Sequence, residues 1–317
     1  MSSPFKYSNT NKRYHTYSYH LKQKYKQKVF RIPIDAGFTC PNRDGTCGYG
    51  GCSFCSSRGS GDTIVGQNIS EQIDAGFEMM RRKWPDGLAI AYFQAYTNTH
   101  ASLQQLIELY EPFFEDERFV EVIIATRSDS LDQEKIDFFA KMAKKKPLWI
   151  ELGLQSIHET TSQYIRRGHD LENFSNCVHQ LAHTDINIGV HIINGLPHET
   201  TEMMIETAKY VATLPIDGLK IHMFHVLKNT LEAHRYQQQA YPLLSREEYV
   251  HITCEQLQYL PPELIILRIT GDGLSSELIA PIWTLKKVQV TNEIDKKLAR
   301  DDAYQGQLYR KHQPTHS

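Results

Sequence analysis

The sequence predicts an α/β protein whose core is a partial (β/α)6 barrel. Apolar, β-branched runs of strand length alternate along the chain with segments of helical periodicity. Near-continuous apolar strands separated by helices are typical of a parallel sheet with helices on its outer face. Polar residues gather at the ends of these runs. Because the active sites of parallel barrels lie at the carboxyl ends of their strands, this pattern favours an enzyme over a scaffold.

The predicted strands and helices follow one another in a regular order. The apolar runs occupy residues 29–37, 88–95, 119–127, 147–156, 186–195 and 216–226. Helices are predicted at 70–84, 101–114 and 200–214, where apolar side chains recur about every 3.6 residues. Ser70 and Thr200 are plausible N-caps, because their hydroxyls accept hydrogen bonds from the first free N–H groups of a helix.

Three regions follow from this order. Residues 1–28 form a basic, tyrosine-rich N-terminal extension, residues 29–230 form the barrel core, and residues 231–317 form a mostly helical C-terminal extension. Within the last region, residues 264–273 predict one added strand and residues 284–304 a terminal helix.

Composition narrows the class of protein. Hydrophobic residues make up 40% of the chain, enough for a substantial core, yet no apolar run is long enough to span a membrane. The N-terminus lacks the apolar stretch of a secretory signal, so we expect a cytoplasmic protein. In that reducing compartment, clustered cysteines are more often metal ligands or catalytic groups than disulfides. The isolated Cys177 and Cys254 are expected to be core residues.

The N-terminal extension has an unusual distribution of charge, since residues 1–34 contain no Asp or Glu. Their cations are Lys6, Lys12, Arg13, Lys22, Lys24, Lys26, Lys28 and Arg31, interleaved with Tyr7, Tyr14, Tyr17, Tyr19 and Tyr25. Cations attract phosphates and exposed tyrosine rings stack on bases, so the segment is either a solvated basic arm or a nucleic-acid contact.

The loop after the first predicted strand, CPNRDGTCGYGGCSFC, holds four of the six cysteines. Cys52 and Cys55 form a C-x-x-C pair, Cys40 lies upstream, and Cys47 lies between. One interpretation is a zinc site with four thiolates. The other is a [4Fe–4S] cluster held by three thiolates, which leaves one iron open. The position of the loop, directly after a strand of the predicted barrel, favours the cluster.

These residues resemble the radical S-adenosylmethionine (SAM) superfamily. The C-x11-C-x2-C spacing, the aromatic residue in CSFC and the six strand-and-helix units carry this resemblance. More narrowly, the segments GFTCPNRDGTCGYGGCSFC, YFQAYTNT, ELGLQS, RRGHD and HIINGLPHET resemble the YtqA/YhcC-type branch, which is similar to the catalytic subunit of Elongator. The resemblance implies that Cys40, Cys52 and Cys55 ligate a single [4Fe–4S] cluster and that SAM is the second cofactor. Cys47 departs from this three-cysteine pattern: we expect a bystander on the loop, and the alternatives are a ligand that yields to SAM and a member of a zinc site.

The resemblance implies further cofactor contacts, with one departure. The Gly-Gly-Glu that usually marks the SAM amino-group site is absent, and Gln94, Tyr96 and Thr97 stand in its place. Glu151 is a carboxylate inside an apolar strand, and a buried charge needs a partner, such as a ribose hydroxyl, the SAM ammonium or a neighbouring Arg. The other expected cofactor residues are Phe54, Gln155, Ser156, Arg167, His191 and Asn194. On the sixth strand, Lys220 and His222, with His225 nearby, are expected to face the substrate as catalytic residues.

The resemblance also suggests a substrate. The Elongator family acts on the wobble uridine of tRNA, and the YtqA-like branch is associated with modification of the side chain on C5 of that base. The implied reaction trims a carboxymethylaminomethyl group to an aminomethyl group, with a flavodoxin or ferredoxin as reductant. Neutralising Lys22, Lys24, Lys26 and Lys28 would then weaken tRNA binding. The alternatives are a radical SAM enzyme acting on a small metabolite and a non-catalytic zinc-binding RNA adaptor.

Overall fold

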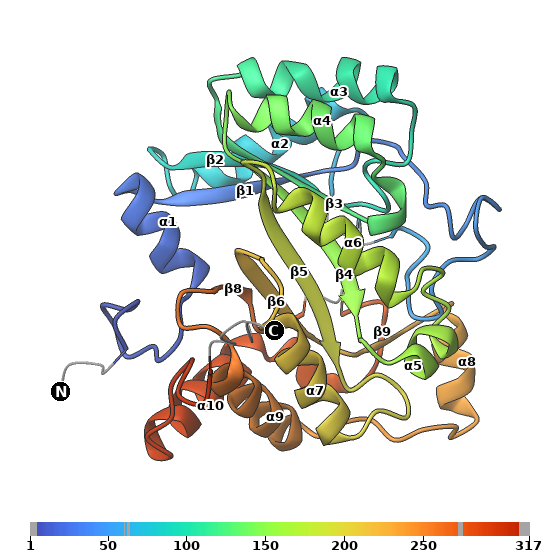
Figure 1. Ribbon diagram of the computed structural model, residues 1–317, viewed down its shortest axis with the longest axis vertical. Coiled ribbons are helices and arrows are strands. Elements are labelled where there is room, and N and C mark those ends of the chain that lie inside the picture. The colour runs from blue at the N-terminus through green and yellow to red at the C-terminus, as the bar shows by residue number, and fades with distance from the viewer. Residues whose placement is uncertain (1–4, 60, 62–63, 272–274, 311–317) are drawn as a thin grey trace, which may run out of the picture.

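A single curled sheet organises the chain in the computed structural model, which describes residues 5–59, 61, 64–271 and 275–310. The sheet has seven parallel strands in the order β1-β2-β3-β4-β5-β6-β8, and helices cover its outer face (Figure 1). The strands are β1 (Val29–Ile34), β2 (Leu88–Phe93), β3 (Phe119–Thr126), β4 (Leu148–Gln155), β5 (Asn187–Asn194), β6 (Gly218–Met223) and β8 (Ile265–Arg268). The predicted partial barrel is confirmed.

One strand of the sheet comes from the predicted C-terminal extension. β8 pairs in parallel with β6, so the sheet has seven strands rather than six. The sequence predicts this strand but not its partner, because partner choice depends on how the chain between β6 and β8 packs. β1 and β8 form the two edges, and the barrel stays open between them.

Six helices follow the strands, and all of them except the shortest, α5 (Glu159–Tyr164), bury apolar side chains on their inner faces. They are α2 (Ile69–Arg81), α3 (Leu103–Glu115), α4 (Gln133–Ala143), α5 (Glu159–Tyr164), α6 (Leu171–Leu181) and α7 (Thr201–Val211). Thr200 caps α7 as expected, since its side chain accepts a hydrogen bond from Met203 N. The cap of α2 is Asn68 rather than Ser70, because the helix begins one residue earlier than Ser70 and Asn68 accepts from Glu71 N. None of the described helices combines the length and apolar character that a membrane crossing needs.

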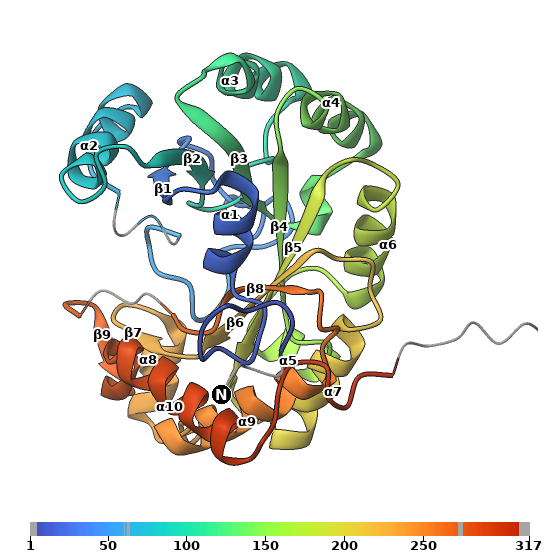
Figure 2. The same ribbon diagram turned by 90° about the vertical axis from the view of Figure 1, so that its left-hand side faces the viewer.

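The N-terminal extension is part of the barrel and does not form a free arm. Helix α1 (Tyr17–Tyr25) lies over the amino ends of the strands (Figure 2) and contacts both β1 and β8. Ile266 N donates to His15 O at 2.7 Å, which ties the segment before α1 to the edge strand β8. The segment thus closes the gap between the edge strands β1 and β8 at the amino ends of the strands.

Two tyrosines of the N-terminal extension are therefore unable to stack on a base. Tyr14 is 3% exposed and Tyr17 is 8% exposed, and the Tyr17 ring packs edge-on against Trp149. Tyr25 donates to Glu121 Oε1 at 2.8 Å, and Lys24 Nζ lies 2.6 Å from the same oxygen. The expectation of exposed rings is wrong for both: Tyr17 packs at the bottom of the barrel with Trp149, and Tyr14 packs beside Cys254 and Asp295 of the C-terminal helices.

The C-terminal region packs beside the barrel. It contains α8 (Leu231–Gln237), α9 (Arg246–Tyr259) and α10 (Lys287–Arg300), and α9 contacts both α7 and α10. A short antiparallel pair, β7 (Val226–Leu227) with β9 (Leu278–Ala280), joins the end of the core to this region. In the described residues the region therefore supplies two strands, β8 and β9, rather than the single strand predicted.

Candidate functional site

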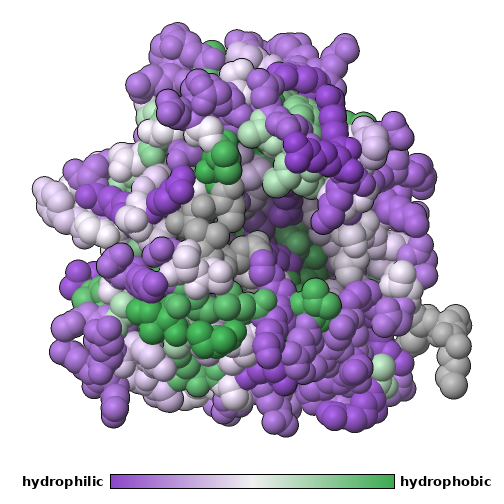
Figure 3. All heavy atoms as spheres, turned by 180° about the vertical axis from the view of Figure 1, so that it is seen from behind, coloured by the Kyte–Doolittle hydropathy of each residue, from purple (hydrophilic) through white to green (hydrophobic). Residues whose placement is uncertain are grey.

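A pocket of 320 Å³ lies inside the open barrel, toward the carboxyl ends of the strands. Figure 3, which shows the face opposite to that of Figure 1, has a hollow near the middle of the molecule. The residues discussed below that line the pocket are Cys40, Arg43, Cys52, Phe54, Cys55, Tyr92, Gln94, Tyr96, Thr97, Arg127, Glu151, Gln155, Arg167, His169, His191, Lys220, His222, His225 and Arg268. Its size falls in the range of cofactor and substrate sites.

The cysteine loop brings three of its four thiols to the pocket wall. Cys40, Cys52 and Cys55 line the pocket. Backbone hydrogen bonds fold the loop tightly, including Arg43 N to Cys40 O at 2.7 Å and Cys55 N to Cys52 O at 3.0 Å. Gly51 has φ +81°, and a Cβ there would meet Arg43 Nε at 2.8 Å, so the turn before Cys52 requires glycine.

The chemistry of these thiols fits a metal cluster. Burial, and then the neighbouring Cys55, raise the pKa of Cys52 to about 12, so this thiol ionises near neutral pH only beside a strong positive charge such as iron. Asn42 Nδ2 lies 3.7 Å from Cys52 Sγ and can donate to it. In the described part of the chain, no group of three or more His, Cys, Asp or Glu side chains is already closed around a metal position. The three thiols share one wall of the pocket, and the donor set is the three-thiolate set of a cluster with one open iron.

Cys47 is placed differently from the other three thiols. Its side chain is exposed, it does not line the pocket, and its Sγ lies 3.7 Å from Arg127 Nη2. Arg127 in turn pairs with Asp129 and donates to Arg167 O at 2.6 Å, which fixes the guanidinium below the loop. A bystander position for Cys47 agrees with this geometry.

We expect Cys47→Ser to keep the cluster, because the substitution leaves all three pocket thiols in place. Iron per chain and the visible absorbance of anaerobically reconstituted protein should match those of the wild type. Cys254→Ser, at a buried site on α9 that contacts α10, is a control for the loss of a thiol far from the loop. Loss of iron from Cys47→Ser alone would make Cys47 a ligand.

Most of the cofactor residues expected from the sequence line this pocket. They are Phe54, Gln94, Tyr96, Thr97, Glu151, Gln155, Arg167 and His191. Tyr96 and Gln155 have positive φ values of 55° and 59°. At Gln155 the register between β4 and β5 shifts, and this bulge re-aims the side chain at the end of the strand. These placements agree with the expected contacts, whose roles remain proposals.

Ser156 and Asn194 do not line the pocket, in contrast to the expectation. Ser156 donates to Glu199, and Asn194 exchanges two hydrogen bonds with Gln256 of α9, at 2.7 and 2.9 Å. Both side chains are buried. The structure uses them to attach neighbouring elements to the strand ends, because a buried polar group needs a hydrogen-bond partner.

Arg167 has both a structural and a pocket-facing part. Its Nη1 donates to Leu154 O at 2.6 Å and to Ser156 O at 2.7 Å, so it braces the end of β4. Its Nη2 is buried and has no hydrogen-bond partner among the described residues. Since Arg167 lines the pocket, this nitrogen is available to an acceptor on a ligand.

A buried ion pair forms the floor of the pocket. Lys220 of β6 pairs with Glu151 of β4 and donates to Tyr92 Oη at 2.8 Å. Burial lowers the pKa of Lys220 to about 8, although Glu151 partly opposes the shift. For Glu151, burial acts to raise the pKa, but the charges of Lys220 and Arg31 outweigh it and lower the pKa. The pair is therefore ionised at neutral pH.

Three histidines adjoin this floor. The rings of His191 and His222 lie 5.1 Å apart, and those of His222 and His225 lie 5.3 Å apart. Burial, and then the charge of Lys220, lower the pKa of His191 to about 3, and burial lowers the pKa of His222 well below its usual value. Both rings are neutral at pH 7. His222 Nδ1 lies 2.8 Å from Met223 O and donates to it, which leaves Nε2 as an acceptor.

Five ionisable side chains that line the pocket were not among the expected site residues: Arg43, Tyr92, Arg127, His169 and Arg268. Tyr92 and Arg268 are polar residues inside apolar strands, which is the signal that identified Glu151. Arg127 stands at a strand end, as other expected residues do. Arg43 carries no distinguishing sequence signal, since only the folding of the loop brings it to the thiols.

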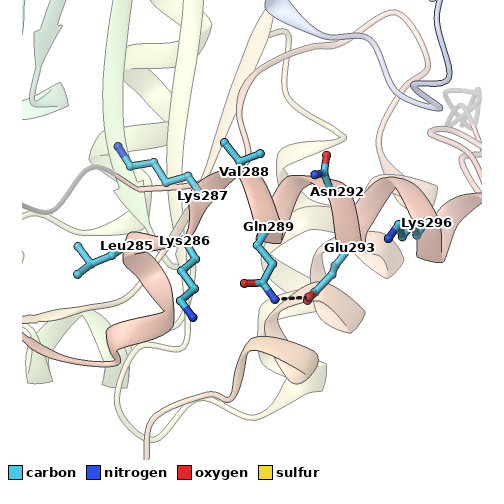
Figure 4. Close-up of a pocket in the computed structure, with 8 residues that line it drawn as sticks. All are labelled: Leu285, Lys286, Lys287, Val288, Gln289, Asn292, Glu293 and Lys296. Atoms are coloured by element: carbon cyan, nitrogen blue, oxygen red, sulfur yellow. Dashed lines mark hydrogen bonds between the residues drawn. The ribbon is translucent and has the colours of Figure 1, made fainter.

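A second hollow of 730 Å³ lies on the outer surface at the start of α10. Lys286, Lys287 and Lys296 line it together with Val288 and Asn292, as Figure 4 shows. Burial, and then the charge of Arg268, lower the pKa of Lys287, so this lysine lies within electrostatic reach of the barrel pocket. The described residues that line the hollow include no thiol, and their cationic side chains suit an anionic surface ligand.

The chain is similar to known proteins over its whole length. Residues 42–211 match the radical SAM superfamily and residues 216–300 match the Radical_SAM C-terminal domain. The uncharacterized protein YtqA of Bacillus subtilis is 44% identical over 313 residues, which cover 98% of this chain and 97% of YtqA.

Two further similarities concern Elongator-like proteins. The structure of Methanocaldococcus infernus Elp3 has a TM-score of 0.66 at 16% identity, covering 88% of this chain and 64% of that one, so it shows a shared fold. The tRNA uridine(34) acetyltransferase of the same organism is 24% identical over 158 residues, 49% of this chain and 29% of its own length. The chain therefore belongs to the radical SAM superfamily, in the YtqA/YhcC-type branch related to the Elongator catalytic subunit, and its cofactors are a [4Fe–4S] cluster and SAM.

Proposed function

We propose that this radical SAM enzyme trims the carboxymethylaminomethyl group on C5 of the tRNA wobble uridine to an aminomethyl group. The observation that carries the proposal is the charged floor of the pocket, where Lys220 and Glu151 stand buried with Arg268 beside them. A charged substrate side chain can bind Glu151 Oε1, which has no hydrogen-bond partner among the described residues, whereas an apolar substrate would leave it unpaired. The similarity to a tRNA uridine(34) acetyltransferase supports a wobble uridine as the base.

The residues at the two ends of the pocket have different proposed roles. Cys40, Cys52 and Cys55 would hold the cluster, with Arg43 and Arg127 balancing the charge of the thiolates. When bound, the cluster and SAM supply a 5′-deoxyadenosyl radical that removes a hydrogen atom from the substrate. The barrel wall shields the radical from bulk solvent, and the floor holds the substrate group.

The proposed reaction is redox-neutral overall. A secondary amine R–NH–CH2–COO⁻, SAM and water give R–NH2, glyoxylate, methionine, 5′-deoxyadenosine and a proton. The hydrogen removed is one on the glycine-derived methylene, and the carbon–nitrogen bond beside it is the bond that breaks. Glyoxylate is therefore expected in equal amount to the aminomethyl product.

The tRNA backbone would approach the open side of the barrel. Lys287, at the start of α10, lies beside that route, because the charge of the pocket residue Arg268 acts on it. Helix α1 and its lysines cover the amino ends of the strands (Figure 2), and Lys24 is already paired with Glu121. The start of α10 is thus better placed to guide the wobble base into the pocket.

The test combines conversion with binding. Anaerobically reconstituted enzyme, reduced and supplied with SAM, is expected to convert tRNA bearing the carboxymethylaminomethyl group and to release glyoxylate. Replacing Lys286, Lys287 and Lys296 by Gln should lower the slope of log affinity against log salt by about 2 to 3, and replacing Lys22, Lys26 and Lys28 by Gln should lower it less. Deoxyadenosine formation without tRNA conversion, with binding insensitive to salt, would point instead to a small metabolite.

A further inference from the structure

The ion pair at the pocket floor has unused hydrogen-bonding capacity. Glu151 is 5% exposed, and its Oε1 has no hydrogen-bond partner in the described part of the chain. An ammonium group has three N–H donors, and Lys220 uses two of them, on Glu151 Oε2 and Tyr92 Oη. His191 Nε2 is also buried without a partner among the described residues, and all three side chains line the pocket. Together the three side chains offer one ligand an acceptor, Glu151 Oε1, and two nitrogens, those of Lys220 and His191.

The floor and the thiol end have different charged neighbours. Lys220, Arg31 and Arg268 act on Glu151, and Tyr92 is hydrogen-bonded to it. Arg43, Arg127 and Arg167 act on the thiols. The pocket therefore has two polar ends, and we assign the thiol end to the cofactors and the floor to a second ligand.

We propose that Glu151, Lys220 and His191 form a binding site for the zwitterion of an N-substituted glycine. The secondary ammonium donates to Glu151 Oε1, while the carboxylate accepts from the remaining N–H of Lys220 and from His191 Nε2. The site rests on the proposed function, because the carboxymethylaminomethyl group is such a glycine. It assigns Glu151 to the substrate, whereas the sequence suggested a contact with SAM.

Hydrogen-bonding capacity favours a zwitterion over a simple ion. A lone anion would leave the buried Glu151 Oε1 without a donor. A lone cation would satisfy Oε1 but would leave the donor of Lys220 unused and would add net positive charge beside it. A zwitterion satisfies both partners and adds no net charge to a buried site. The product, an aminomethyl group, lacks the carboxylate and is expected to bind more weakly.

The test measures binding without turnover. Oxidised holoenzyme with saturating SAM and no reductant is titrated calorimetrically with N-benzylglycine, its methyl ester, benzylamine and 5-carboxymethylaminomethyluridine. The variant is Glu151→Gln with Lys220→Gln, which removes both charges together and leaves neither one unpaired. The matched control is Glu121→Gln with Lys24→Gln, which removes another ion pair at the opposite end of the strands. Thermal unfolding of both variants checks that each is folded.

We expect the two zwitterions to bind the wild type and the control alike, and the Glu151/Lys220 variant about 10- to 100-fold more weakly. The ester and benzylamine should bind the wild type about as weakly as the zwitterions bind that variant. Equal binding of the zwitterions by all three proteins, or no binding by the wild type, would overturn the proposal. So would a loss of SAM affinity in place of zwitterion affinity. The wild type could bind N-benzylglycine more tightly than the Glu151/Lys220 variant and yet fail to convert tRNA. That result would uphold this site and refute the proposed function.

Discussion

Replacement of any one of Cys40, Cys52 or Cys55 by Ser is expected to remove the iron–sulfur cluster and abolish 5′-deoxyadenosine formation. Each of the three thiols lines the pocket, and a cluster with one open iron depends on all three. A serine hydroxyl is a hard, weakly acidic ligand that does not replace a soft thiolate on iron. Iron content should fall from about four per chain to well below one after reconstitution.

The comparison of four single variants makes this prediction specific. Cys47→Ser should retain the iron, the visible absorbance and the deoxyadenosine yield of the wild type, since Cys47 lies outside the pocket wall. Circular dichroism should show that all four variants keep the fold, because the loop lies at the edge of a large core. If the wild type binds zinc and forms no deoxyadenosine, the loop is a zinc site in this chain, and the catalytic assignment fails.

Breaking the Glu151–Lys220 pair from one side is expected to be the most destabilising polar substitution in the barrel. Lys220→Met leaves a carboxylate that is 5% exposed without its main partner, and a change of this kind costs about 3–5 kcal/mol in the free energy of unfolding. Removing both charges with Glu151→Gln and Lys220→Met should cost less, because neither member of the pair is then left without the other. Urea unfolding of the two single variants and the double variant measures the difference. A loss in the double variant equal to the sum of the two single losses would show that the two charges are not coupled.

The same pair predicts a pH dependence for tRNA conversion. The pKa of Lys220 is lowered to about 8, so its ammonium is present below that pH and is lost as the pH rises above it. The groups that face Lys220 are Arg31 on β1, Tyr92 on β2, Glu151 on β4, His191 on β5 and Arg268 on β8. His191 stays neutral throughout this range, because its pKa is lowered to about 3.

We therefore expect the conversion rate to fall above about pH 8 while SAM cleavage in the absence of tRNA keeps its own, different profile. The two rates are measured on the same enzyme preparation over a window of about 1.5 pH units on either side of the pKa. If conversion and uncoupled cleavage fall together, the titrating group acts on the cofactor end of the pocket, and Lys220 is not responsible.

Local patterns in the sequence determined the architecture and the chemistry class of this protein. The alternation of apolar runs and helical segments reflects burial on both faces of a parallel sheet, which depends on nearest neighbours in the chain. The spacing of Cys40, Cys52 and Cys55 is short enough for one loop to place all three thiols around one cluster. Both features are local, so the order of residues along the chain is enough to predict them.

Long-range packing decided the rest. Glu151 needed a partner, but only the curl of the sheet shows that Lys220 supplies it across 69 positions of the chain. Ser156 and Asn194 stand at strand ends like true pocket residues, yet neighbouring helices and loops capture their side chains. The tyrosines of the N-terminal segment look available to RNA, but Tyr14 and Tyr17 are buried in the protein core.

The physical reason for this division is the range of the interactions involved. Periodicity, capping and ligand spacing depend on residues within about one turn or one loop of each other, so they can be predicted directly from the sequence. The choice of partner for a buried polar group depends on which distant element packs against it, and several residues of the same type can satisfy it equally well. The sequence alone therefore determined that this chain is a radical SAM barrel, and the tertiary structure decided which side chains form its two-ended pocket.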